Sequence, residues 1–484
     1  MLWSWNELSS KEKWSEFKAL ADSEDVETFI LGEFKPTGRL VLKYNGQEVA
    51  NLDMKFMHKG RPKVVRQAVY ARPAVAPITV KSDDVTLWAQ TAVSNSVTGN
   101  PVSDSKNNFT CDLEAILSSL NVASKHWVIR QYDHEVQGGS VLKPLVGVAN
   151  DGPGDAAVLR PRVCSRRGLV VSNGMNPNYG DYDTYNMAAS AIDEAIRNAV
   201  AVGANPSTLT LLDNFCWGNS EKPEVLGSLV HAALACYDVS IAMGTPFISG
   251  KDSLNNEFRP EGKEPIAIPP SLLISAMGQV DDVATCVSMD FKKAGNALFV
   301  VGLTKNELGG SHLSLVRNWV GGQSPTLDVV VARRTYETVY KAIQSGMIRS
   351  IHDLSEGGLV VSLAESAFAG GLGAEVSTSQ IPFEAGQEEL NKLPQIDAAQ
   401  FTDYVKLFSE TNSRFVVEVP EEKSSAFEAL FNDSNVVIGR IGKVTEAPRL
   451  KIVGDGDSVL VDSDVFELKR LWQKPFDLGG EYTD

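Results

Sequence analysis

Five short strings of this chain bring carboxylate, amide, hydroxyl and glycine residues to the ends of predicted secondary-structure elements. The strings are GPGDAAV (152–158), AIDEAIRN (191–198), LLDNFCWGN (211–219), SGKDSLN (249–255) and IHDLSEGG (351–358). Ligands of open α/β folds bind at such ends. Oxygen donors suit Mg²⁺, and glycine allows a ligand to approach the backbone closely. Together the strings predict a site that holds a metal ion and phosphate groups.

Three of these strings contain candidate metal ligands. Asp155 follows two glycines, although a Pro-Gly turn with a solvated aspartate is the alternative. Glu194 and Asn198 are four residues apart and share one helix face, as an ordinary surface pair also would. Asp353 and Ser355 precede two glycines and an apolar helix. Anion binding at the helix N-terminus and simple N-capping both fit that pattern.

The other two strings follow predicted strands. An apolar strand ends in Asp213 and Asn214, and the aromatic residues that follow, Phe215 and Trp217, would be either core or ligand-lining residues. The strand TPFIS is expected to end at Gly250, with Lys251 and Ser253 on the following loop. A lysine offers a point charge for phosphate, although a solvated turn is the alternative.

The string SGKDSLN is not a Walker phosphate-binding loop. That motif needs four residues between its glycines and a hydroxyl after the lysine. Here five residues separate Gly244 from Gly250, and Asp252 stands after the lysine. The six histidines show no zinc-protease spacing, and no Ser/His/Asp or Cys/His triad is visible. His134 and His352 are the histidines worth testing, because polar strings surround them, and no catalytic residue is assigned.

The bulk composition is that of an ordinary globular protein. The 484 residues carry a formal net charge of −16, with 43% hydrophobic and 22% charged residues. Without a basic block, a nucleic-acid partner is not expected. We expect neither a membrane span nor a signal peptide. Five widely spaced cysteines favour reduced thiols and a cytoplasmic location.

The predicted elements give a mixed α/β chain. Apolar residues at helical spacing predict helices at 184–204, 223–243, 331–347 and 358–370. Strands are predicted at 141–148, 168–172, 207–215, 245–249, 296–303 and 414–419. Because the pattern restarts near residue 288, we expect two α/β domains, 120–287 and 288–464. Residues 61–119 would bridge to them, and 465–484 would form a polar tail.

The first 60 residues resemble a later part of the same chain. The segment from Phe17 aligns without a gap to the segment from Phe427, at an offset of 410 residues, and the matches include Arg39 with Arg449. Chance similarity of two helix–strand units is the alternative. A true repeat would make residues 1–60 the C-terminal stub of a preceding unit and the chain one half of a tandem protein.

Taken together, the strings resemble formylglycinamidine ribonucleotide synthase, an ATP-dependent amidotransferase of purine biosynthesis. The matching stretches occur in the family's order through most of 120–450 and include QYDHEVQGGSVLKPLVG, LLDNFCWGNSEKPE and HDLSEGGLVVSLAE. The resemblance implies tandem two-domain units of the type found in aminoimidazole ribonucleotide synthetase.

The resemblance implies a role for each candidate. Asp155, Glu194, Asn198 and Asp353 would hold Mg²⁺ under ATP or ADP, with Ser355 touching the nucleotide. Asp213 and Gly250 would contact ATP, and Ser253 would contact the substrate. Some members have a metal-binding asparagine after Gly250. Lys251 stands here instead, so we assign it to phosphate and expect no metal at that position.

The implied activity is the conversion of formylglycinamide ribonucleotide, ammonia from glutamine, and ATP into formylglycinamidine ribonucleotide, ADP and phosphate. The family's Asn-His-Pro string, most of its first half and a glutaminase domain are absent from this sequence. This chain would therefore supply the second half of an incomplete enzyme, with the first half and a glutaminase as partners. The alternative is a nucleotide-binding structural half without turnover.

Overall fold

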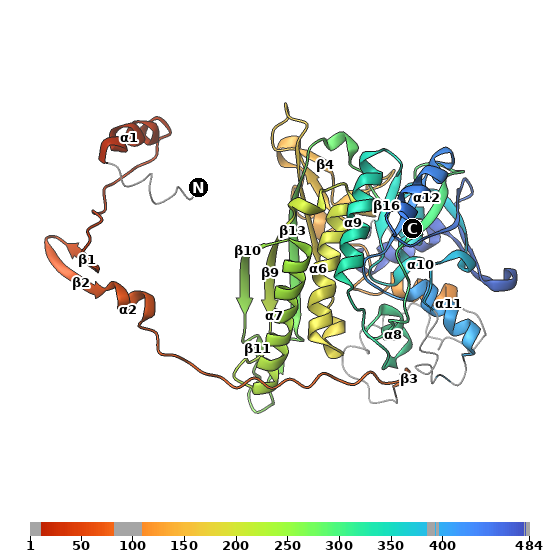
Figure 1. The fold of residues 1–484 in the computed structure, drawn as a ribbon, viewed down its shortest axis with the longest axis horizontal. Coiled ribbons are helices and arrows are strands. Elements are labelled where there is room, and N and C mark those ends of the chain that lie inside the picture. The colour runs from red at the N-terminus through yellow and green to blue at the C-terminus, as the bar shows by residue number, and fades with distance from the viewer. Residues whose placement is uncertain (1–10, 82–108, 385–392, 394–395, 479, 481–484) are drawn as a thin grey trace. The chain divides into compact units, whose positions relative to one another are not determined.

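The computed structural model describes residues 11–81, 109–384, 393, 396–478 and 480 (Figure 1). They form two compact units, divided between Arg66 and Gln67. In the first unit, helix α1 (Trp14–Ser23) precedes a hairpin of β1 (Arg39–Tyr44) and β2 (Gln47–Asp53) and then α2 (Met54–Lys59). Asn45 and Gly46 both have positive φ, as a two-residue hairpin turn requires.

The elements of the first unit recur near the C-terminus at the same offset of 410 residues. Helix α1 corresponds to α12 (Ser424–Asp433), and the hairpin to β20 (Arg449–Val453) with β21 (Val459–Asp464). Both hairpins are irregular at the same place, after Leu42 and after Ile452. The later copy adds β19 (Ile438–Thr445), which pairs with strands on both sides. The corresponding residues 28–35 form no strand.

In the second unit, a six-stranded sheet is ordered β10-β9-β13-β8-β7-β4. Only β9 and β10 run parallel. The strands are β4 (Ser140–Leu142), β7 (Ala157–Leu159), β8 (Gly168–Gly174), β9 (Thr210–Cys216), β10 (Phe247–Ser253) and β13 (Ser271–Val280). This sheet belongs to what we call the first domain.

The second domain contains a seven-stranded sheet ordered β16-β18-β14-β19-β17-β20-β21. Besides β19, β20 and β21, its strands are β14 (Ala297–Val301), β16 (Ser350–Asp353), β17 (Gly373–Ser377) and β18 (Phe415–Val419). Helices α4 (Phe109–Leu117), α8 (His312–Arg317), α10 (Gly358–Gly370), α11 (Ala398–Phe408) and α13 (Val465–Gln473) contribute apolar residues to one core over this sheet.

Helix α6 (Thr184–Ala201) lies between the two sheets (Figure 1). All but one of its residues are buried, because the first sheet, α7 (Pro223–Met243), α9 (Val329–Gln344) and β16 surround it. One apolar core includes residues of both domains here, among them Ile192, Leu211 and Phe299. Charged residues on α6 are therefore held between the domains.

Short elements complete the fold: α5 (His126–Arg130), β3 (Thr79–Val80), β5 (Leu145–Val146), β6 (Gly152–Pro153), β11 (Glu257–Phe258), β12 (Ile266–Ala267) and β15 (Trp319–Val320).

The structure corrects three expectations. Strand β10 runs through Lys251 to Ser253, so the predicted loop after Gly250 is wrong; backbone pairing with β9 extends the strand. The predicted polar tail instead begins with α13, because Val465, Leu468 and Trp472 are spaced for one buried helix face. The strand predicted at 141–148 is split into β4 and β5, with Pro144 between them.

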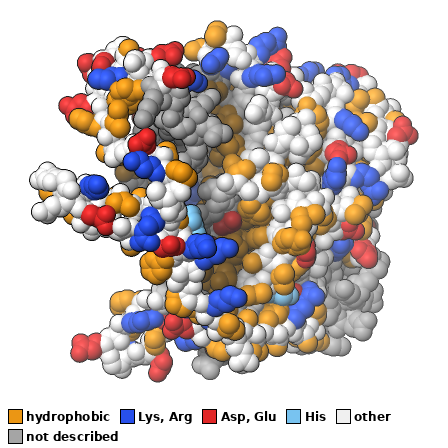
Figure 2. All heavy atoms as spheres, turned by 60° about the vertical axis from the view of Figure 1, so that its left-hand side comes forward, with side chains coloured by type: hydrophobic (Ala, Val, Ile, Leu, Met, Phe, Trp, Pro, Cys, Tyr) orange, Lys and Arg blue, Asp and Glu red, His pale blue; other side chains and the backbone are white. Residues whose placement is uncertain are grey.

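Among the described helices, α7 is long and apolar enough to cross a membrane by length and composition alone. Helices of water-soluble cores pass the same test, and here α7 packs against α6 and α9. Its exposed side includes Val230, Leu234, Tyr237 and Ile241. Acidic, basic and hydrophobic side chains are interspersed on the face shown in Figure 2, without a basic stripe.

Candidate functional site

Asp155 and Asp353 come together although 198 residues separate them. Asp155 follows β6, and Asp353 is the last residue of β16 in the second domain. Asp155 Oδ1 accepts a hydrogen bond from the Asp353 backbone N–H at 3.2 Å and lies 2.7 Å from His352 Nδ1. The predicted ligands of two distant strings therefore meet where the domains adjoin.

His352 is fixed between carboxylates. Its Nδ1 faces Asp155, and its Nε2 lies 2.9 Å from Oε2 of Glu365 on α10. Burial alone would lower the pKa of His352, but the Asp155 carboxylate beside it raises that pKa well above its ordinary value. The imidazole is then a cation that orients Asp155. Asp155, His352 and Asp353 have candidate ligand atoms within 4.8 Å of one another, but a protonated His352 cannot itself bind a metal.

Glu194 and Asn198 reach the same region from α6. A Cβ on Gly174, at the end of β8, would lie 2.3 Å from the Ala191 carbonyl oxygen, so only glycine lets α6 pack this close. Glu194 Oε2 then accepts hydrogen bonds from Met175 N at 3.0 Å and Asn176 Nδ2 at 2.6 Å. Asn198 Nδ2 donates to the backbone oxygen of Asn173 at 3.1 Å.

Three of the four predicted ligands use one polar atom for the protein and keep an oxygen available, whereas both side-chain oxygens of Asp353 have a protein contact. Within the part of the chain that the structure describes, three oxygens accept no hydrogen bond: Oδ2 of Asp155, Oε1 of Glu194 and Oδ1 of Asn198. Asp353 Oδ1 has only the ion pair with His352 Nδ1, at 3.4 Å. The buried Asn198 oxygen without a donor is costly unless a ligand supplies a contact.

The electrostatics of this region also fit a divalent cation. Burial and the nearby carboxylates of Glu356 and Asp353 raise the pKa of Glu194 well above its usual range. A Mg²⁺ ion takes oxygen ligands and would relieve that repulsion. The residues present therefore fit Mg²⁺, which three carboxylates and one amide would hold, while His352 orients Asp155 and Asp353.

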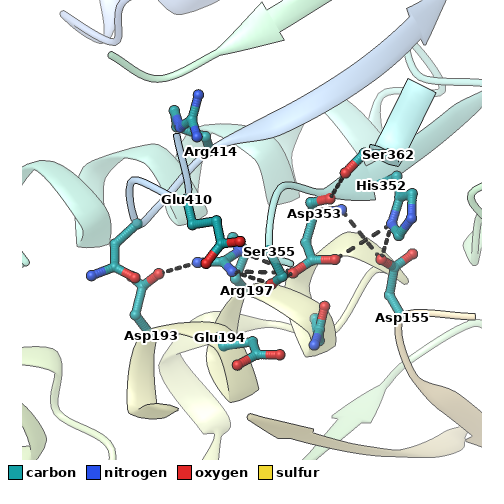
Figure 3. A network of polar contacts seen from close by, with 12 residues as sticks. Asp155, Asp193, Glu194, Arg197, His352, Asp353, Ser355, Ser362, Glu410 and Arg414 are labelled. Atoms are coloured by element: carbon teal, nitrogen blue, oxygen red, sulfur yellow. Dashed lines mark hydrogen bonds and ion pairs between the residues drawn. The ribbon is translucent and has the colours of Figure 1, made fainter. Parts of the chain in front are cut away.

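Arg197, which the sequence analysis missed, is the central cation of the region (Figure 3). Its guanidinium pairs with Asp193 one turn earlier on α6 and with Asp353 Oδ2 at 3.1 Å. It also donates to Ser355 Oγ at 2.7 Å, and Ser355 in turn donates to Asp353 Oδ2. Ser355 is therefore held beside Asp353.

Asp193 extends this network into the second domain. Its carboxylate accepts hydrogen bonds from Ser413 N at 2.9 Å, from Ser413 Oγ at 2.6 Å and from Tyr336 of α9. Asp193 and Arg197 are four residues apart on a helix, and that spacing was the available signal for a pair. The sequence could not show that both side chains are buried between domains.

The remaining predicted residues, on β9 and β10, are placed differently. Gly174, Ile274, Asp213 and Gly250 occupy one row across the sheet. Two strand spacings separate Gly174 from Asp213, roughly 10 Å. The Asp213 carboxylate lies over Gly250, where a Cβ would approach Asp213 Oδ1 to 2.5 Å. Asp213 and Gly250 are thus in contact with each other. Ile274 lies between them and Gly174, the residue of this row that packs against Glu194.

Lys251 and Ser253 lie on the other face of β10. Side chains alternate along a strand, so Lys251 and Ser253 share a face that Gly250 does not. Lys251 Nζ donates to Ser253 Oγ. The sequence analysis placed Lys251 and Ser253 on a loop after Gly250. In the structure they form one pair on one face of strand β10, while Asp213 and Gly250 form another pair on the opposite face.

Comparison with known proteins connects this geometry to a family. The model "AIR synthase related protein, N-terminal domain" matches residues 153–280, and "AIR synthase related protein, C-terminal domain" matches residues 293–455. The chain carries both AIR synthase related domains. The two matches cover most strands of the two sheets, all but β4 and β21, and they include the four predicted metal ligands.

Some proteins are similar to this chain over nearly its whole length. The phosphoribosylformylglycinamidine synthase subunit PurL of Thermococcus sibiricus is 30% identical over 97% of this chain and 57% of its own length. The PurL subunit of Leifsonia xyli subsp. xyli is 33% identical over 89% of this chain and 50% of its own length. The chain therefore spans about half the length of the relatives it matches.

Solved structures share the fold of the two AIR synthase related domains. Thermotoga maritima PurL complexed with FGAR gives a TM-score of 0.55 at 16% identity, covering 75% of this chain and 54% of that chain. The same protein complexed with ADP gives a TM-score of 0.53 at 16% identity, covering 76% and 52%. These matches confirm the predicted tandem α/β fold.

Proposed function

We propose that this chain is the second half of a phosphoribosylformylglycinamidine synthase. The observation that carries the proposal is the contact of Asp155 with Asp353 at the junction of two AIR synthase related domains, beside helix α6, which carries Glu194 and Asn198 and is tied to Asp353 by Arg197. The PurL relatives named above support the reaction class. The reaction would convert formylglycinamide ribonucleotide, glutamine-derived ammonia and ATP into formylglycinamidine ribonucleotide, ADP and phosphate.

In this proposal the four oxygen ligands hold Mg²⁺ and, through it, the phosphates of ATP or ADP. The metal would supply positive charge to the phosphate oxygens. His352 fixes Asp155, while Arg197 holds Asp353 and Ser355, and Ser355 would contact the nucleotide from there. Burial of these groups strengthens their electrostatic interactions relative to those in water.

Residues on the first sheet would contribute separate contacts. We propose that Asp213 and Gly250 contact ATP on the helix-covered face of the sheet. Lys251 would bind a phosphate group on the opposite face, with Ser253 beside it contacting the substrate. The Asp213–Gly250 pair and the Lys251–Ser253 pair lie on opposite faces of the sheet, which supports two ligand-contact surfaces rather than one loop.

The partners in this proposal are a first-half unit and a glutaminase. Residues 1–60 would be the end of a preceding repeat unit, and the recurrence of α1 and the β1–β2 hairpin at α12 and β20–β21 supports that assignment. Widely spaced cysteines are typical of proteins with reduced thiols, and we propose a cytoplasmic location for this chain.

A second candidate is a nucleotide-binding structural half without turnover. Arg197 and Asp193 form a buried ion pair on α6, and each also contacts the second domain, through Asp353 and Ser413. These contacts already hold the site in place without a partner chain, which favours a structural role. The two candidates share the metal–nucleotide site and differ in whether product forms when the partners are supplied.

Complementation separates the two candidates. The full chain is purified, its bound nucleotide is quantified, and formylglycinamidine ribonucleotide is measured with and without a first-half chain and a glutaminase. Product that requires this chain, and that falls with Asp155→Asn, supports the synthase. Retained ADP without product supports the structural half. If neither nucleotide nor product is found, the proposal is wrong.

A further inference from the structure

Residues 28–35, which lie between α1 and β1 in the first unit, expose large apolar side chains. Leu31 is 99% exposed, Phe34 is 75% exposed and Phe29 is 74% exposed. The segment forms no strand. Because apolar side chains that gather on an exposed segment mark an interaction surface, we asked which structure these residues fit.

The internal repeat provides that structure. At the offset of 410 residues, the segment 28–35 corresponds residue by residue to strand β19 of the second domain. Strand β19 lies inside its sheet, where it pairs antiparallel with β14 on one side and with β17 on the other. The counterparts of Leu31 and Phe34 are Ile441 and Val444, which are 2% and 1% exposed. Positions that the complete sheet buries are therefore exposed in the first unit.

The elements on either side of this segment show the same difference. Phe17 of α1 is 38% exposed, whereas its counterpart Phe427 of α12 is 0% exposed. Leu42 of β1 is 48% exposed, whereas its counterpart Ile452 of β20 is 0% exposed. The apolar residues of the first unit thus occupy the positions that pack into the core of a complete domain.

A glycine within the segment also fits a close neighbouring strand. Gly32 corresponds to Gly442 of β19, where a Cβ would lie 1.9 Å from the Glu375 carbonyl oxygen of β17. A Cβ on Gly32 would meet nothing within 4 Å. Glycine inside a strand often marks a place where another backbone approaches closely. Gly32 therefore has the residue type that a packed strand requires at this position.

We propose that residues 28–35 form a central strand in a β-sheet of the first-half unit, between two strands of that partner. The segment pairs antiparallel with both neighbours, as β19 does, and places Leu31 and Phe34 in the partner's core. In such strand addition, backbone hydrogen bonds supply affinity and side-chain pockets supply specificity. Phe29 replaces Gly439 of β19, so the partner's sheet leaves room for a ring at this position. The inference rests on the proposed function and adds the segment by which the two halves join.

The test is binding of the full chain to a first-half chain, measured by biolayer interferometry with variants at neighbouring positions. Leu31→Ser should weaken binding about 10- to 100-fold, because it removes a large apolar side chain from the partner's core. Gly32→Ala should also weaken binding, since its Cβ meets the adjacent strand. Ile30→Arg is the matched control and should bind as the wild type does, because its counterpart Arg440 is exposed.

Hydrogen exchange gives a direct readout of the strand. The backbone amides of residues 28–35 should exchange fast in the chain alone and become protected in the complex, because they then donate to the partner's strands. Far-ultraviolet circular dichroism establishes that each variant is folded.

Three outcomes would overturn the inference. If the complex forms without protection of residues 28–35, or if Ile30→Arg weakens it as much as Leu31→Ser does, strand insertion is wrong; formylglycinamidine ribonucleotide made by that complex would leave the proposed function intact. Concentration-dependent protection in the chain alone would assign the segment to a second copy of this chain instead. If the two chains neither bind nor form product, the proposed function fails together with this inference.

Discussion

Replacing Arg197 with methionine should destabilise the second unit more than any exposed arginine replacement. The Arg197 side chain is 3% exposed and neutralises Asp193 and Asp353, which are 0% and 7% exposed. Methionine keeps the length of the side chain but leaves two buried carboxylates without their cation. Removing one partner of a buried ion pair costs about 3–5 kcal/mol.

That cost translates into a measurable shift in melting temperature. An unfolding entropy of about 2.1 cal/mol/K per residue gives roughly 0.9 kcal/mol/K for a unit the size of residues 67–484. The expected decrease in Tm is therefore about 3–6 °C. Differential scanning calorimetry in a metal-free buffer with EDTA measures it, because the chelator prevents a cation from replacing the guanidinium.

Arg333 offers a matched control on the surface. It pairs with Glu337 at 3.1 Å, and the two side chains are 58% and 47% exposed. Arg333→Met should change stability by about 0–1 kcal/mol, as is usual for exposed pairs. If Arg197→Met shifts Tm no more than Arg333→Met does, the buried network does not join the domains as described.

Three further predictions concern other parts of the chain. Asp155→Asn and Asn198→Ala should each weaken Mn²⁺ binding measured by electron paramagnetic resonance, because each removes one available oxygen; unchanged affinity would exclude that residue as a ligand. Burial raises the pKa of Cys236 to about 12, so at pH 8 iodoacetamide should modify exposed Cys164 in the native protein and Cys236 only after unfolding. Modification of both at equal rates would contradict the packing of α7. A Cβ on Gly227 would lie 2.0 Å from the Val69 carbonyl oxygen, so Gly227→Ala should release that segment and speed chymotryptic cleavage after Tyr70, whereas Gly32→Ala, with nothing within 4 Å, should not.

The sequence predicted helices well where one apolar face is long. The helix expected at 223–243 has those bounds, and the helix expected at 184–204 ends three residues early, at Ala201. The turn-like residues of SGKDSLN predicted a loop after Gly250. The structure has a strand there instead, because Lys251 pairs with Asn214 on β9. Local patterns do not contain that long-range partner.

The candidate site was predictable in its oxygen donors but not in its cations. Asp155, Glu194 and Asp353 stood out because carboxylates next to glycine or on one helix face are unusual at the ends of elements. Arg197 carried no comparable signal, since a charged residue on a helix is normally solvated. Its role depends on burial of α6 between two sheets, and that burial is set by tertiary packing.

The most direct test of the central claim is a crystal structure of the full chain with Mn²⁺ and ADP, with the metal located by anomalous scattering. The four-oxygen site predicts a peak within coordination distance of Asp155, Glu194, Asn198 and Asp353, with ADP phosphates on the same ion and Ser355 beside the nucleotide. Nucleotide bound in the crystal at another place, with no anomalous peak among these four side chains, would contradict it.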